Sequence, residues 1–175
     1  MKSLCCLLVL CRGFSFAHAQ IPERIVQEWE MLTAHGGTWV ADNSVYKNEN
    51  ETADAYAISW TYGLGKTSLQ GRLYGIIAGK ETPTFWEFRM YYHPEEKKLM
   101  YQQYGWGGVL GIAEMTLPDA THSSDEATFY NPDGSSYKIK HENETLNNTQ
   151  YAQSYQWKDG TWEKQRYYEW VLKTS

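Results

Sequence analysis

The chain has 175 residues, a formal net charge of −5 at pH 7 and 21% charged residues. This length suits one domain with one hydrophobic core. An acidic chain without a basic run is poorly suited to nucleic acid, whose phosphates require clustered Lys and Arg, so we expect no nucleic-acid partner.

Residues 1–19 have the pattern of a secretory signal peptide. Lys2 supplies a positive start, residues 4–10 are apolar, and an A-x-A cleavage pattern ends at residue 19. The apolar run is far shorter than the about 20 residues of a bilayer span. We therefore expect one domain over 20–175, a secreted or periplasmic location and no stable membrane anchor. All three cysteines precede the cleavage point, so the mature domain has no disulfide.

The first predicted element is a helix over 22–34. Ile25, Trp29 and Leu32 fall on one face, which is typical of a helix that packs against a core. A glycine pair after residue 35 ends the pattern. We expect this helix to cover one end of a sheet.

Runs with strand character follow the helix in quick succession. The predicted strands are 38–46, 54–62, 67–78, 84–93, 98–106, 109–117, 126–131, 135–142, 149–157 and 161–172. Segments 131–134 and 158–160 have turn chemistry and predict hairpins. No helical run separates the strands, which disfavours a parallel βαβ sheet.

Antiparallel strands in a domain of this size must hide their edges. Closure into a barrel does so most simply, whereas a sandwich needs long crossover connections. We therefore predict an all-β fold, a closed or nearly closed antiparallel up-and-down barrel of about 8 to 10 strands with one short N-terminal helix. A jelly-roll sandwich is the competing architecture.

The aromatic content indicates the nature of the interior. The chain has 14 Tyr and 8 Trp against 5 Phe, and amphipathic rings suit half-buried strand positions and ligand-facing walls. Alternation along the last strand places Trp162 on the inner face with Arg166 and Tyr168. The same rule applied to the preceding strands predicts an aromatic cavity. Its candidate ligand-binding residues are Tyr137, His141, Tyr151, Tyr155, Arg166 and Tyr168.

The tripeptide Gly37-Thr38-Trp39, directly after a short helix, resembles the first signature of the lipocalin and wider calycin superfamily. The resemblance implies that Trp39 seals the closed end of a barrel and that an Arg from the last strand packs over it. Arg166 is the matching position. Such a cation–π contact contributes about 0.5 to 2 kcal/mol.

Two further segments resemble exported bacterial lipocalin-like domains of unknown function. They are the hairpin at 159–162 and the turn at 92–94. This resemblance also implies a barrel.

The sequence contains no recognisable metal or cofactor site. The histidines after the leader, His35, His93, His122 and His141, have no metal-ligand spacing, so we expect no metal and no cofactor. Haem barrels of the nitrobindin type use a histidine of the last strand, which this chain lacks. The glycine-rich segment 104–111 lacks the features of a phosphate loop and predicts a tight bend, with a role at a pocket mouth as the alternative.

The function predicted from these features is binding of a small, partly apolar and potentially anionic molecule in the barrel. No catalytic motif is recognisable, and an enzyme with His141 as general base is the alternative. A carbohydrate-binding sandwich with exposed rings is a third hypothesis. Sequons at Asn50, Asn143 and Asn147 are potential glycosylation sites.

Overall fold

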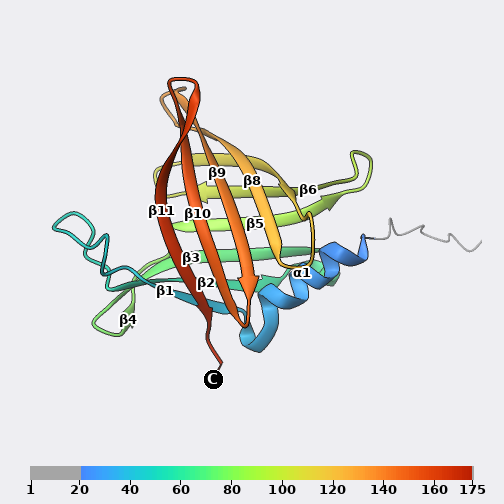
Figure 1. Ribbon diagram of the computed structural model, residues 1–175, viewed down its shortest axis with the longest axis horizontal. Helices are drawn as coiled ribbons and strands as arrows, with labels where there is room; N and C mark the ends of the chain where they lie inside the picture. The colour runs from blue at the N-terminus through green and yellow to red at the C-terminus, as the bar shows by residue number, and fades with distance from the viewer. Residues whose placement is uncertain (1–20, 175) are drawn as a thin grey trace, which may run out of the picture.

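The computed structural model describes residues 21–174, and the predicted signal peptide lies outside them. The described chain is a closed antiparallel up-and-down barrel of ten strands with one short N-terminal helix (Figure 1). No helix among these residues has the length and apolar character of a membrane span.

The elements follow the predicted order closely. They are α1 (Glu23–Thr33), the 3-10 turn η1 (Ala34–Gly36), β1 (Thr38–Asp42), β2 (Ala55–Tyr62), the 3-10 turn η2 (Leu64–Lys66), β3 (Ser68–Ile77), β4 (Lys80–Glu81), β5 (Trp86–His93), β6 (Lys98–Gly105), β7 (Val109–Thr116), β8 (His122–Tyr130), β9 (Ser136–Leu146), β10 (Thr149–Lys158) and β11 (Thr161–Leu172). The two-residue β4 extends a hairpin from β3 and lies outside the ring of ten. β8 begins four residues earlier than predicted and β9 ends four residues later, because their polar residues pair along the wall.

Closure of the sheet follows from the position of β1. Each long strand pairs with its neighbour in the chain, and β1 also pairs with β11. Val40 lies opposite Ala57 on one side and Val171 on the other. Every long strand therefore has two partners, which removes the exposed edges that a sheet must otherwise protect. The sandwich alternative is wrong.

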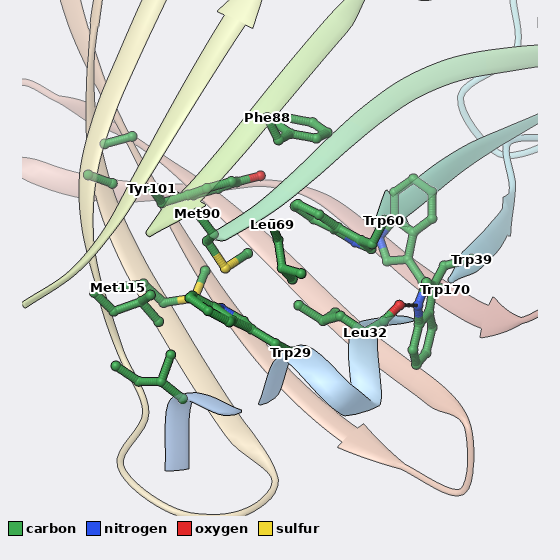
Figure 2. Packing of buried hydrophobic residues seen from close by; sticks show 14 of the residues in the cluster. Trp29, Leu32, Trp39, Trp60, Leu69, Phe88, Met90, Tyr101, Met115 and Trp170 are labelled. Carbon is green, nitrogen blue, oxygen red and sulfur yellow. Dashed lines mark hydrogen bonds between the residues drawn. The ribbon is translucent and has the colours of Figure 1, made fainter. Parts of the chain in front are cut away.

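The helix α1 lies across one end of the barrel (Figure 1). Trp29 and Leu32 are buried, as their shared helical face predicts. The Leu32 carbonyl accepts a 3.0 Å hydrogen bond from the indole nitrogen of Trp39, drawn dashed in Figure 2. Trp170 of β11 belongs to the same buried cluster. This end of the barrel is filled by side chains of the helix and of the first and last strands.

Candidate functional site: the barrel cavity

A cavity of about 380 Å³ lies inside the barrel. Its wall includes residues of α1 and of nine of the ten long strands, β1 being the exception. Most of the lining is aromatic or aliphatic, with a minority of polar side chains. This volume is at the lower end of the range of small-molecule sites.

Aromatic rings of the wall lie on strand glycines. A Cβ atom at Gly111 would lie 2.5 Å from the ring of Phe129, and one at Gly105 would lie 2.7 Å from Trp86. A Cβ atom at Gly71 would likewise lie too close to the indole ring of a tryptophan on the neighbouring strand. Because glycine has no side chain, each ring can lie flat against the strand instead of projecting across the interior. These glycines therefore help to keep the cavity open.

The glycine-rich segment 104–111 has two roles. Gly107 and Gly108 have φ angles of 83° and 85° in the turn between β6 and β7, as the predicted tight bend requires. Gly105 and Gly111, by contrast, lie in paired strands. Trp106 of the turn is 77% exposed.

A buried ion pair joins β8 and β9 at the cavity wall. The Nδ1 atom of His141 lies 3.1 Å from a carboxylate oxygen of Asp125. The Asp125 side chain is 2% exposed and that of His141 is 30% exposed, because the imidazole borders the cavity. Burial lowers the pKa of His141, but the charge and hydrogen bond of Asp125 outweigh it, so the pKa is raised above its ordinary value of 6.5.

A second polar pair lies next to the first. Asn143 of β9 donates a 3.2 Å hydrogen bond to the Ser123 hydroxyl of β8, and both residues line the cavity. The Asn143 side chain thus faces the interior, and glycosylation of this sequon stays a prediction. Asn50 and Asn147 are exposed, and their glycosylation stays a prediction.

Arg166 contacts the loop between β1 and β2. Its guanidinium donates hydrogen bonds of 2.5 and 2.6 Å to the two carboxylate oxygens of Glu51. It also donates to the Tyr168 hydroxyl and lies 5.0 Å from the ring centre of Tyr46. The hydrogen bonds from Arg166 are the main reason that the pKa of Glu51 falls from 4.5 to about 2.

The predicted contact between Trp39 and Arg166 is wrong. Trp39 pairs with Leu172, and Arg166 lies six residues earlier on β11, about 20 Å away along an extended strand. The two side chains therefore lie towards different ends of the barrel. The last-strand arginine packs over a tyrosine of the loop after β1, and the closed end is filled by apolar side chains.

Tyr137, His141, Arg166 and Tyr168 line the cavity, whereas Tyr151 and Tyr155 do not. Tyr155 pairs in register with Lys140, whose ammonium lies 4.4 Å from the tyrosine ring centre on the outer face. The small and polar residues of β10, including Ala152, line the interior instead. The expectation that aromatic residues point inward assigned the wrong face to this strand, because the register with β9 places Ala152 and Ser154 inside and Tyr155 outside.

A bulge explains the position of Trp162. Gln153 pairs with Tyr167 but Tyr155 pairs with Lys164, so β11 has one extra residue between these pairs. An extra residue reverses the alternation of faces. Trp162 consequently lies opposite Trp157 on the outer face, and not inside with Arg166 as simple alternation predicts.

Three polar residues of the cavity wall, Gln103, Ser123 and Asp125, were not predicted from the sequence. Gln103 lies within the predicted strand 98–106, and alternation with its neighbours could have placed it inside. Ser123 and Asp125 precede the predicted start of their strand, so no face was assigned to them. Among residues 21–174, no group of three or more potential metal ligands lies close enough to hold an ion.

Comparison with known protein families matched no family model, and a search of curated proteins found no significantly similar sequence.

Proposed function

We propose that this protein binds a small, partly apolar and uncharged molecule in the barrel cavity. The observation that carries the proposal is the cavity itself, about 380 Å³ in volume, with walls that are mostly aromatic and aliphatic and carry a minority of polar side chains. Enclosed, mostly apolar cavities with a few convergent polar groups are the usual ligand sites of proteins.

The charges around the cavity are paired within the protein. Arg166, a cationic residue among the candidate ligand-binding residues, makes two hydrogen bonds to Glu51. Asp125 pairs with His141, and Glu28 of α1 accepts a 2.9 Å hydrogen bond from Arg24. A charged ligand would have to displace one of these partners and lose its own hydration, which disfavours it. An uncharged ligand fits the paired charges better.

The proposed class is an exported lipocalin-like binding protein. The Gly37-Thr38-Trp39 resemblance and the predicted signal peptide support this class, and an antiparallel barrel beginning directly after a helix is compatible with it. The proposal therefore includes secretion or a periplasmic location.

Titration with N-phenyl-1-naphthylamine, an uncharged fluorescent probe, tests the proposal. We expect saturable binding to the purified protein. Ala152→Phe places a ring in the cavity and should weaken binding at least tenfold. The matched variant Lys138→Phe adds a ring to the exposed face of β9 and should not change binding. Mass spectrometry of small molecules that co-purify with the protein would then identify natural ligands.

Two results would contradict binding in the cavity. One is the absence of saturable binding by the folded protein. The other is equal binding by the Ala152→Phe and Lys138→Phe variants, since that result would place the probe on the outer surface.

A second candidate function is proton-transfer catalysis by His141. Asp125 engages Nδ1, and no described residue hydrogen-bonds to Nε2, so this nitrogen is available to a bound substrate. Once a substrate is identified, His141→Gln should abolish its turnover with little effect on its binding. Unchanged turnover would exclude this role.

The carbohydrate-binding hypothesis has less support. It required coplanar exposed rings in a row on a sandwich, whereas Trp157 and Trp162 cross at 67° on a barrel hairpin. Their edge-to-face contact across the strands stabilises that hairpin.

A further inference from the structure

Strand β6 presents polar side chains to both sides of the barrel wall, and the two sides differ in hydrogen bonding. On the outer side, the Gln102 amide donates to the Tyr91 hydroxyl at 3.3 Å, and the Tyr104 hydroxyl donates to Gln102 at 2.8 Å. On the inner side, Tyr101 and Gln103 line the cavity. The outer polar groups thus have protein partners.

Gln103 has a buried amide nitrogen that lacks a hydrogen-bond partner among the described residues. The residue is 6% exposed, and its Nε2 atom has no hydrogen-bond partner in the described part of the chain. A buried, unpaired amide destabilises a fold, and such groups are rare in native proteins. Because Gln103 lines the cavity, a ligand oxygen could accept a hydrogen bond from this nitrogen.

Tyr101 supplies a second donor two residues away on the same face, about 7 Å along the strand. The residue is 8% exposed, and no described group hydrogen-bonds to its hydroxyl. Burial, with the nearby charge of Asp125, raises the pKa of Tyr101 well above its ordinary value. The hydroxyl is therefore protonated and can donate.

Rings border these two donors. The centre of the Tyr101 ring lies 5.7 Å from that of Phe88 and 6.4 Å from that of Trp60 (Figure 2). A flat conjugated molecule would contact these rings over a large area.

We infer that the ligand of this cavity is a flat, uncharged ring compound with a carbonyl-type oxygen, and that Tyr101 and Gln103 donate hydrogen bonds to that oxygen. This inference rests on the proposed binding function and specifies the class of ligand.

Equilibrium dialysis with 9-fluorenone and fluorene tests the inference, because the two probes share one skeleton and differ in the carbonyl oxygen. We expect the protein to bind fluorenone about tenfold more tightly, since one hydrogen bond to an otherwise unpaired buried donor has an effect of this order. Tyr101→Phe and Gln103→Leu should each reduce this preference, measured as the ratio of the two dissociation constants, at least threefold. Gln102→Leu, which alters the outer face of β6, should keep the preference.

The possible failures are distinguishable. Equal binding of both probes, or a preference that survives in both Tyr101→Phe and Gln103→Leu, would overturn the carbonyl inference and leave the binding function standing. Binding of neither ring probe by a protein that still binds N-phenyl-1-naphthylamine would overturn only this inference, whereas binding of none of the three probes would overturn the proposed function as well. If Gln103→Leu does not fold, as judged by circular dichroism, Gln103→Met replaces it, and loss of the preference is again the expected result.

Discussion

The inner and outer faces of the barrel wall differ in how their polar groups are satisfied. On the outer face of β9, Lys140 donates to Glu142 at 2.7 Å and lies over the Tyr155 ring. On the inner face, His141 depends on the buried carboxylate of Asp125, and Gln103 of β6 has an unpaired nitrogen. Outer groups can exchange their partners for water, whereas His141 depends on one buried partner and the Gln103 nitrogen has none among the described residues. Substitutions on the inner face should therefore have the larger effects.

The largest expected effect is the loss of the buried ion pair. His141→Leu leaves the Asp125 carboxylate buried without its partner, and we expect a loss of about 3 kcal/mol in the free energy of unfolding. His122 makes comparable contacts with Asp119 and Glu144, but at the exposed start of β8. His122→Leu should therefore cost much less. Urea unfolding of both variants measures the difference, and equal losses would remove the distinction between the two faces.

The next effect concerns the glycines beneath the rings. Gly111→Ala introduces a Cβ atom 2.5 Å from Phe129, so the ring must move into the cavity. We expect a loss of about 1 to 3 kcal/mol in unfolding free energy and weaker binding of N-phenyl-1-naphthylamine. Ile112→Ala, on the outer face of the same strand, should not change probe binding. Unaltered binding by Gly111→Ala would show that Phe129 does not limit the cavity.

A smaller effect, of opposite sign, is expected at Gln103. Gln103→Leu removes the buried unpaired amide and should raise the free energy of unfolding of the ligand-free protein by about 1 kcal/mol. Gln102→Leu removes a hydrogen bond of the outer face and should lower it slightly. Thermal unfolding monitored by circular dichroism compares the two. Destabilisation by Gln103→Leu would mean that its amide has a partner in solution.

The smallest effect is a pH dependence of stability. The pKa of His141 is raised in the folded protein, so its contribution is complete below the ordinary value of 6.5 and is lost as pH rises through the folded value. Unfolding free energy should therefore decrease from pH 6 to pH 8. The exposed His122, whose pKa Asp119 also raises, contributes with the same sign. His141→Gln should reduce the change of unfolding free energy with pH more than His122→Gln does. The reverse order would mean that the pH dependence of stability arises on the outer face.

Much of the fold could be predicted from local patterns. The predicted helix matches α1 to within one residue at each end, because Ile25, Trp29 and Leu32 recur at helical spacing. All ten long strands were predicted, since turn residues separate runs of alternating character. The closed barrel followed from the need to hide strand edges.

The candidate site was only partly predictable. Alternation placed Tyr137, His141, Arg166 and Tyr168 on the inner face, where they line the cavity. Alternation failed for Tyr155. Both faces of β10 carry aromatic and polar residues, so alternation alone does not show which face points inward, and the register with β9 decides it.

The sequence by itself determined the elements of this protein, their order and the antiparallel barrel, because spacing and turn chemistry act between near neighbours in the chain. The tertiary structure decided which residues meet across strands. The bulge in β11 turned Trp162 outward, Glu51 in a distant loop bound Arg166, and Gln103 remained unpaired beside the cavity. These outcomes depend on register and on packing between residues far apart in sequence, which no local pattern encodes.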